Sequence, residues 1–400
     1  MRDMAATSEA ESRTPAPAPA LVHFALAVGG FAIGTTEFAT MSLLPCFSRD
    51  LRIDAPTAGH VISAYALGVV VGAPLFAVIG ANLARRSLLI GLMAIFALAN
   101  ALSALAPSYG WMLLFRFLSG LPHGAYFGIA SLVAASLVPT EQRTAAVGRV
   151  MLGLTVATIV GVPLANLLGQ AIGWRWGFWG FGLVAILASL TAVLVALFAP
   201  RDKPQGGGGA LRELSALRRS QVWLTLAIGA IGFGGMFAVY TYLTSTLLSV
   251  THAGAAVTPF VLMAFGVGMT AGNLIVPRFA DRALMPSAGI MLAWSAVMLA
   301  LYPFAAHTVA TIILDMLAIG FGVALATILQ TRLMDVAGEA QGLAAALNHS
   351  AFNTANALGP WLGGMAIAAG YGFASTGFVG AGLALAGLVV WALAWAAARH

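Results

Sequence analysis

Charged residues are scarce in this chain of 400 residues: Asp, Glu, Lys and Arg together make up 8% of it, whereas hydrophobic residues make up 60%. Soluble globular domains contain about 25% charged residues. A chain with so little charge lacks the polar surface that a soluble domain needs. The composition therefore excludes a soluble globular protein and indicates a protein that lies within a lipid bilayer.

Cysteine and nucleotide-binding loops are also lacking. The single cysteine, Cys46, excludes an intramolecular disulfide and a cysteine-rich metal site. No Gly-x-x-x-x-Gly-Lys-Ser/Thr sequence is present to bind the phosphates of ATP, so ATP hydrolysis is not expected as the energy source. We expect no cofactor and no metal. No nucleophile with a base and no signalling domain is evident, so an intramembrane enzyme or a sensor is a remote alternative.

Long apolar stretches recur along the whole chain. About 20 apolar residues in a helix cross ~30 Å of hydrocarbon, and a helix is the expected form because lipid offers no partner to unpaired backbone groups. The first stretch is too long for the apolar core of a signal peptide. The sequence predicts an all-α polytopic membrane protein with twelve spans: 21–45, 56–80, 87–107, 110–137, 145–172, 175–199, 221–249, 256–277, 286–305, 308–333, 340–369 and 373–397.

Basic residues are divided unequally between the two sets of loops. Fifteen of the nineteen lie on the side of the termini, and only Arg49, Arg52 and Arg175 lie on the other side. Because cytoplasmic loops are enriched in Lys and Arg, both termini are predicted to be cytoplasmic. The net charge of +6 is explained by this asymmetry, so we expect the lipid bilayer as a partner and no nucleic acid.

The predicted spans form two similar sets. A polar tail covers residues 1–20, and a Gly-rich linker at 200–220 separates six-helix bundles at 21–199 and 221–400. Sequence features recur at an offset of about 200 residues, for example Gly120 and Gly320. Two parallel six-helix repeats are typical of a transporter whose site lies at their interface near the bilayer midplane.

Three local motifs carry a family resemblance. They are Gly34-Thr-Thr-Glu37-Phe38, Arg116-Phe-Leu-Ser-Gly120, and the segment from Gln341 to Asn353. With the repeat, they make residues 21–397 resemble the major facilitator superfamily, and most of all the bacterial twelve-helix drug/proton antiporters of the arabinose-efflux and chloramphenicol-exporter type. The resemblance implies export of a small organic solute across the bacterial inner membrane in exchange for protons, by alternating access. The expected chain is a monomer.

The family's conformational motifs are present with two departures. The basic pair Arg85-Arg86 lacks the usual preceding acid, whereas the second copy keeps Asp281 before Arg282. The Gly-Pro motif of helix five is altered, and its literal form stands in the eleventh span. The residues that the resemblance assigns to these motifs are Gly72, Arg85, Arg86, Gly120, Gly161, Pro163, Asp281, Arg282, Gly359, Pro360, Gly363 and Gly364.

Three charges lie inside predicted spans. Glu37, Arg116 and Asp315 each sit about 10 Å below the same face, given a rise of 1.5 Å per residue. A charge at the bilayer centre costs at least ~2.5 kcal/mol, so such residues are functional candidates. We interpret Glu37 and Asp315 as proton-coupling residues. The alternatives are a static ion pair between Glu37 and Arg116, and exposure of Asp315 to water at the cavity mouth.

Polar and aromatic side chains on the predicted cavity helices are candidates for substrate binding. His123 is a candidate proton relay or ligand contact, and each of the others also has a packing alternative. The glycine stripe Gly120, Gly124 and Gly128 is expected to pack closely against another helix. The substrate-binding or cavity candidates are Arg116, His123, Tyr126, Tyr240, Tyr242, His349, Asn353 and Asn356.

The residues alone leave the direction of transport open, because one rocking cycle runs either way. The alternative function is a proton symporter or a uniporter that imports a sugar, a nucleoside or an amino acid. In either case the expected partners are a small-molecule substrate and, for coupled transport, protons drawn from a proton gradient. The substrate itself is left open, since a few cavity side chains determine it.

Overall fold

In a computed structural model, the part of the chain that is described consists of helices and short connections. It comprises residues 19–80, 83–139, 143–175, 190–191, 193–195, 197, 217–280, 282–337 and 341–398, and these contain no β-strand. The predicted tail at 1–20, most of the linker at 200–220 and most of the span at 175–199 lie outside the described residues. The boundaries of the two bundles therefore stay predictions.

The elements fall into two groups in chain order. The N-terminal group consists of α1 (Pro19–Ser42), α2 (Leu44–Asp50), α3 (Ala55–Gly80), α4 (Arg85–Ala104), α5 (Tyr109–Ser136), α6 (Arg143–Val156), the π-helical turn η2 (Ala157–Gly161) and α7 (Val162–Ile172). The C-terminal group consists of α10 (Ser220–Gly232), α11 (Gly234–Ser249), η4 (Ala255–Val257), α12 (Thr258–Ile275), α13 (Pro277–Ala280), α14 (Leu284–Ala305), α15 (Val309–Phe321), η5 (Gly322–Ala324), α16 (Leu325–Ala337), α17 (Gln341–Ala366), η6 (Ile367–Tyr371), η7 (Phe373–Ser375) and α18 (Thr376–Ala397).

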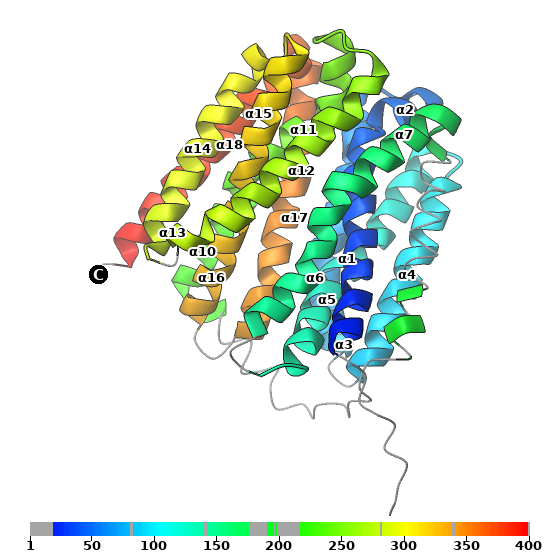
Figure 1. The fold of residues 1–400 in the computed structure, drawn as a ribbon. Helices are drawn as coiled ribbons and strands as arrows, with labels where there is room; N and C mark the ends of the chain where they lie inside the picture. Colours follow the sequence, from blue (N-terminus) through cyan, green and yellow to red (C-terminus); the bar gives the residue numbers. More distant parts are fainter. Residues whose placement is uncertain are drawn as a thin grey trace, which may run out of the picture.

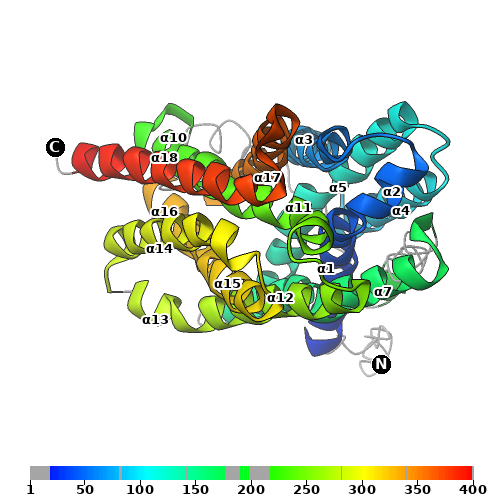
Figure 2. The ribbon, with the colours of Figure 1, turned by 90° about the horizontal axis from the view of Figure 1, so that it is seen from above.

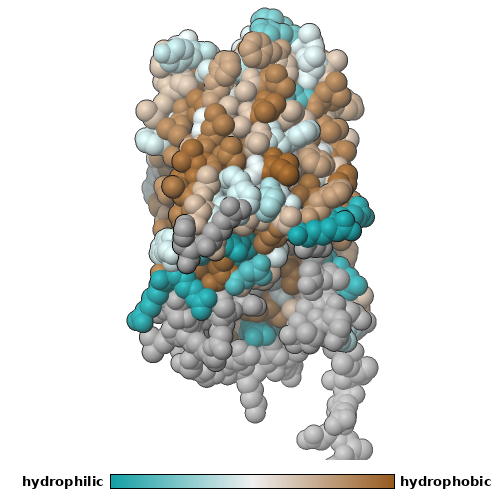
Figure 3. Space-filling model, turned by 90° about the vertical axis from the view of Figure 1, so that its left-hand side faces the viewer, coloured by the Kyte–Doolittle hydropathy of each residue, from teal (hydrophilic) through white to brown (hydrophobic). Residues whose placement is uncertain are grey.

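The predicted all-α membrane fold is confirmed, and the count of twelve spans stays a prediction. Among the described residues, ten helical segments are long and apolar enough to cross a membrane, and α17 covers most of the predicted span at 340–369. Large apolar side chains face outward along these helices, including Phe24, Leu98, Phe260 and Phe304. Figure 3 shows hydrophobic side chains over the middle of one face, and hydrophilic ones mostly toward its two ends. Lipid is the environment that accepts so much exposed apolar surface.

The two groups lie side by side with their helices roughly parallel (Figures 1 and 2). Across the boundary, α3 packs along α17, and α12 packs along α7 and η2. We name the end of the bundle that contains α2 and the loops at 51–54, 105–108 and 250–254 the distal end. The opposite end, which contains the start of α1 and the start of α4, is the proximal end.

Glycine contacts show the same packing in both groups. The position of a Cβ on Gly68 or Gly120 would overlap backbone at the α3–α5 contact, and Gly268 and Gly320 are placed in the same way at the α12–α15 contact. The predicted repeat thus appears as two equivalent close helix crossings. Gly128 differs from our expectation for the glycine stripe, because nothing lies within 4 Å of its Cβ position. The close crossing therefore ends before this residue.

Candidate functional site

Glu37 lies on α1 with a buried carboxyl group, and the residue is only 7% exposed. Its Oε1 accepts a hydrogen bond of 2.8 Å from Nδ2 of Asn356 on α17. The bond joins the two groups of helices, and its residues are 319 positions apart in the chain. Two of the predicted site residues are thereby in direct contact inside the bundle.

Arg116 on α5 is 1% exposed and is held by neutral partners. Its guanidinium donates to Oδ1 of Asn100 on α4 at 3.1 Å and lies over the ring of Tyr65 on α3, 4.4 Å from the centroid. Within the described part of the chain, Arg116 and Glu37 form no direct ion pair, although their charges interact at longer range. Arg116 Nε has no hydrogen-bond partner there.

Phe38, the residue after Glu37, extends from α1 into an aromatic cluster of the C-terminal group. Its ring lies 5.3 Å from that of Tyr240, edge to face, and 6.4 Å from the rings of Phe237 and Phe265. Tyr240 is a predicted cavity residue, and its hydroxyl is buried without a hydrogen-bond partner in the described structure. An aromatic cluster with one unpaired hydroxyl thus adjoins Phe38, the neighbour of Glu37 in the chain.

Two other predicted tyrosines lie at helix contacts. The hydroxyl of Tyr126 donates to the backbone oxygen of Leu26 on α1 at 2.7 Å. The hydroxyl of Tyr242 donates to the backbone oxygen of Pro360 on α17 at 2.9 Å and lies over Gly59 of α3. Tyr126 therefore joins helices within one group, whereas Tyr242 lies where the two groups meet.

Asp315 on α15 is 7% exposed and lies apart from Glu37, within the C-terminal group. Its Oδ2 has no hydrogen-bond partner in the described structure, and its charge acts on Tyr302 of α14. Counted at 1.5 Å per residue from the distal ends of their helices, Glu37, Arg116 and Asp315 lie roughly 8, 10 and 9 Å deep. The structure thus holds two separate buried carboxyl groups at similar depth.

The predicted polar stripe of α17 lies along the boundary. His349 lies close to His123 of α5, with ring centroids 6.4 Å apart. Asn353 donates to the backbone oxygen of His349 at 3.0 Å. The Oδ1 atoms of Asn353 and Asn356 are buried and have no hydrogen-bond partner in the described structure. Such atoms are available to a ligand that donates hydrogen bonds.

The predicted conformational motifs lie at helix contacts and helix ends. Gly161 contacts Thr35 and Phe31 of α1, and Gly359 contacts the backbone of Gly234. The remaining motif residues have varied surroundings: Gly72 packs on α5, Pro163 is buried in α7, Gly363 and Gly364 contact Tyr242, Arg85 and Arg86 begin α4, and Arg282 is exposed after α13. Asp281 lies outside the described residues, so the predicted acid–base pair of the second copy is not described.

Side-chain hydrogen bonds between the two groups lie toward the distal end. Thr244 of α11 donates to the backbone oxygen of Ser42 at 3.0 Å, and Ser63 of α3 donates to that of Ala357 at 2.9 Å. These bonds and the Glu37–Asn356 bond are the hydrogen bonds found between the groups in the described residues. All three involve the distal halves of their helices, so the two groups are joined toward the distal end, and we name this the distal-closed arrangement.

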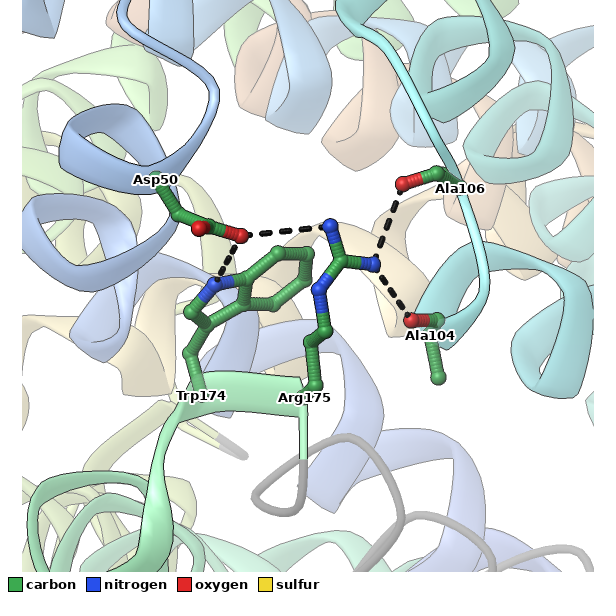
Figure 4. A network of polar contacts seen from close by, with 5 residues as sticks. All are labelled: Asp50, Ala104, Ala106, Trp174 and Arg175. Atoms are coloured by element: carbon green, nitrogen blue, oxygen red, sulfur yellow. Dashed lines mark hydrogen bonds and ion pairs between the residues drawn. The ribbon is translucent and has the colours of Figure 1, made fainter.

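A polar network stabilises the distal end of the N-terminal group (Figure 4). Asp50 accepts hydrogen bonds from Trp174 Nε1 at 2.9 Å and forms an ion pair with Arg175 at 3.2 Å. Arg175 also donates to the backbone oxygens of Ala104 and Ala106, each at 3.1 Å. The network ties α2, the loop after α4 and the segment after α7 together.

Tyr65, Asn100 and Phe38 were not among the predicted site residues. Each is a single polar or aromatic residue in an apolar span, and such residues are common in membrane helices. The signal that pointed to Phe38 was its place next to Glu37 in the first motif. The contacts of Tyr65 and Asn100 depend on which helices are neighbours, and a single span does not show this.

Comparisons with known proteins agree with this architecture. Residues 26–347 match the family model of the Major Facilitator Superfamily. The chain is 44% identical over 370 residues to the inner membrane transport protein YdhP of Escherichia coli K12, covering 90% of this chain and 93% of that protein. It is 34% identical to a chloramphenicol resistance protein of Streptomyces lividans, covering 84% and 86% of the two chains.

A solved structure has the same fold. A bacterial homologue of the human lysosomal transporter Spinster, in an inward-facing occupied conformation, superimposes with a TM-score of 0.70 at 16% identity, covering 94% of this chain and 96% of that one. The family match spans most of the chain, and the alignment with the transport protein YdhP covers nearly the whole length of both chains. The chain is therefore a multi-pass membrane transporter that belongs to the Major Facilitator Superfamily.

Proposed function

We propose that this transporter exports a small organic solute across the bacterial inner membrane in exchange for protons, by alternating access, with Glu37 as the proton-binding group. The single observation that carries the proposal is the hydrogen bond from Asn356 to Glu37. It places a buried carboxyl group, the only acid on α1, at the contact between the two groups of helices. A change in its protonation state therefore acts directly on that contact.

The physical basis is the difference between a charged and a neutral acceptor. A hydrogen bond to a carboxylate is roughly twice as strong as one to a neutral oxygen. Ionised Glu37 therefore favours the distal-closed arrangement, in which Asn356 reaches it. Protonated Glu37 holds Asn356 less tightly and favours separation of the groups at the distal end. Proton binding thus shifts the equilibrium between the two arrangements by its differential interaction with them.

In this proposal the solute competes with the proton, because it binds to polar groups near Glu37 and favours the ionised carboxylate. Asn356 Oδ1, Asn353 Oδ1 and the Tyr240 hydroxyl are buried without partners in the described structure, and the aromatic cluster around Phe38 adds apolar surface. These groups suit a small organic molecule with an apolar ring and hydrogen-bond donors. The name of the chloramphenicol resistance relative supports export of a compound of this kind.

Further features belong to the same proposal. Both termini lie in the cytoplasm, so the distal end faces the periplasm. The protein works as a monomer, uses no cofactor and takes its energy from the proton gradient. Asp315 is a second proton-coupling candidate, because its carboxyl group is buried and Oδ2 has no partner in the described structure.

The test is proton movement in proteoliposomes that contain the purified protein. Candidate solutes from a panel of chloramphenicol, sugars, nucleosides and amino acids are added while the interior pH is recorded. We expect at least one solute to move in the direction opposite to the protons. The Glu37→Gln variant should give no solute-dependent pH change, although it inserts normally and still exchanges labelled solute across the membrane.

Two results would contradict the proposal. Movement of solute and protons in the same direction would indicate a symporter. Solute exchange without any pH change in the wild type would indicate a uniporter, in which Glu37 is structural.

A further inference from the structure

A row of polar side chains lies between Glu37 and the proximal end. It consists of Tyr65, His123 and His349. The hydroxyl of Tyr65 on α3 lies 2.9 Å from Nδ1 of His123 on α5, and both residues are buried. His123 in turn faces His349 on α17, with ring centroids 6.4 Å apart. The ring of His349 is stacked on Phe127 at 5.5 Å with an interplanar angle of 6°, which fixes its orientation.

These groups descend in order through the membrane. Counted at 1.5 Å per residue from the distal ends of their helices, Glu37, Tyr65, His123 and His349 lie roughly 8, 15, 21 and 26 Å deep. His349 is less buried than His123 and is the group nearest to the proximal end. The difference in depth between successive groups is small compared with the thickness of the hydrocarbon.

Tyr65, the group in this row that lies nearest the distal end, interacts electrostatically with Glu37. The charges that act on Tyr65 are those of Glu37 and Arg116, and the guanidinium of Arg116 lies over the Tyr65 ring. The charged or titratable groups that face Tyr65 are therefore Glu37 from α1 and Arg116 from α5, and the titratable group that faces His123 is His349 from α17. Asn100 of α4 is neutral and binds Arg116.

We propose that Tyr65, His123 and His349 form the path by which the proton leaves Glu37 toward the proximal side. The inference rests on the proposed function, since it assumes that Glu37 carries the transported proton. The path crosses from the N-terminal to the C-terminal group between His123 and His349. The path therefore exists only while His123 and His349 lie close together, as they do in this structure.

The transfer balances in protons. The O–H bond of protonated Glu37 breaks, and a water molecule passes the proton to Tyr65 Oη. The original hydroxyl proton of Tyr65 moves to Nδ1 of His123. The proton on Nε2 of His123 then passes through a second water molecule to a ring nitrogen of His349, and from there to solvent. Glu37 ends as a carboxylate, Tyr65 is unchanged, and His123 ends with its proton on Nδ1. It returns to the starting tautomer when Nδ1 gives a proton to water and Nε2 takes one from water, with no net proton gained or lost.

The test separates proton transfer from packing. His123→Gln keeps a side chain that hydrogen-bonds to Tyr65 but removes the group that carries a proton. The chain offers a matched control: His60 on α3 is likewise hydrogen-bonded to a tyrosine, Tyr109, at 3.0 Å, but this pair is exposed near the distal end. In proteoliposomes, the two measured quantities are proton-coupled solute flux and solute counterflow at equal pH on both sides, which needs no net proton transfer.

We expect His123→Gln to lower the ratio of coupled flux to counterflow by about a hundredfold or more, because a positioned general acid–base group contributes about 10²- to 10⁴-fold. Tyr65→Phe should lower the ratio similarly, whereas His60→Gln should leave it at the wild-type value. Added imidazole, a diffusible proton carrier, should partly restore coupled flux in His123→Gln. The number of protons moved per solute should stay unchanged in His123→Gln, Tyr65→Phe and His60→Gln, because the path affects the rate of proton transfer and not the stoichiometry.

A wild-type ratio in His123→Gln, while Glu37→Gln abolishes coupling, would overturn the path and leave the proposed function standing. An equal loss of coupled flux and counterflow would show that His123 serves packing only. Persistent coupling in Glu37→Gln would instead overturn the proposed function itself.

Discussion

At the scale of single residues, the hydrogen bond between Glu37 and Asn356 joins the two groups of helices at the proposed proton-binding group. In Asn356→Ala, the carboxylate loses its donor from the C-terminal group. Hydrogen bonds to charged groups contribute about 1.5–3 kcal/mol, so the distal-closed arrangement should lose roughly tenfold or more in population. Cys46, the single cysteine, lies on α2 at the distal end and is half-buried. We expect a membrane-impermeant thiol reagent to modify it faster in Asn356→Ala than in the wild type.

The pH dependence of that labelling needs a control. Burial raises the pKa of the Cys46 thiol, so its reactive thiolate becomes more abundant as the pH rises. The two proteins should therefore be compared at the same pH. An unchanged labelling rate in Asn356→Ala would mean that the bond does not hold the distal end closed.

Asp54 gives a pH prediction outside the membrane. Its Oδ1 accepts the N–H of Thr57 at the start of α3, at 2.9 Å, and this hydrogen bond holds the pKa of the carboxyl below its usual value. Stabilisation by ionised Asp54 is therefore fully present above about pH 4, the ordinary pKa, and is lost as the pH falls through the lowered value. Because the group is exposed, we expect no more than about 1 kcal/mol.

Asp54→Asn is the matched variant, since asparagine also caps helices but does not titrate. The melting temperature of the detergent-solubilised wild type should approach that of Asp54→Asn, or fall below it, as the pH drops from 6 to 3. Parallel curves for the two proteins would exclude this role of Asp54.

At the scale of elements, two glycines of α5 give opposite predictions. A Cβ on Gly120 would overlap the backbone of Tyr65 on α3, whereas nothing lies within 4 Å of the Cβ position of Gly128. We expect Gly120→Ala to destabilise the protein by about 1–3 kcal/mol, as overpacked sites do, and Gly128→Ala to be tolerated. Thermal unfolding in detergent measures both. Equal stability of the two variants would contradict the close α3–α5 crossing.

The contact between α3 and α11 at the distal end gives a second test at this scale. A Cβ on Gly59 would overlap the hydroxyl of Tyr242. We therefore expect Gly59→Ala to push the two groups apart at the distal end, and Tyr242→Phe to relieve the overlap in the double variant. Spin labels at Arg52 and His252, both in exposed distal loops, report the separation in a Cys46→Ser background.

The distance distribution between the labels should shift to longer values in Gly59→Ala and return toward wild type in the double variant. If Gly59→Ala leaves the distribution unchanged, this contact does not control closure of the distal end.

At the scale of the whole molecule, the fold could be predicted because membrane helices are recorded in composition and span length. The repeat could be predicted because the glycines of the close crossings, such as Gly120 and Gly320, recur at matching positions. The partners of the buried charges could not be predicted from the sequence. An ion pair between Glu37 and Arg116 was one of the alternatives that their similar depth allowed, but Arg116 binds Asn100 and Tyr65 instead. Depth along a helix follows from the sequence, whereas the direction of a side chain depends on packing between helices.

If proton and solute compete at Glu37 as we propose, the most direct measurement is proton release from purified protein in weakly buffered detergent when a transported solute is added. Binding linkage is reciprocal, so a solute that favours ionised Glu37 should release up to about one proton per protein near the pH where Glu37 titrates. Glu37→Gln should bind the solute without releasing a proton. Equal release by both proteins, or none by the wild type across the pH range of transport, would contradict the account.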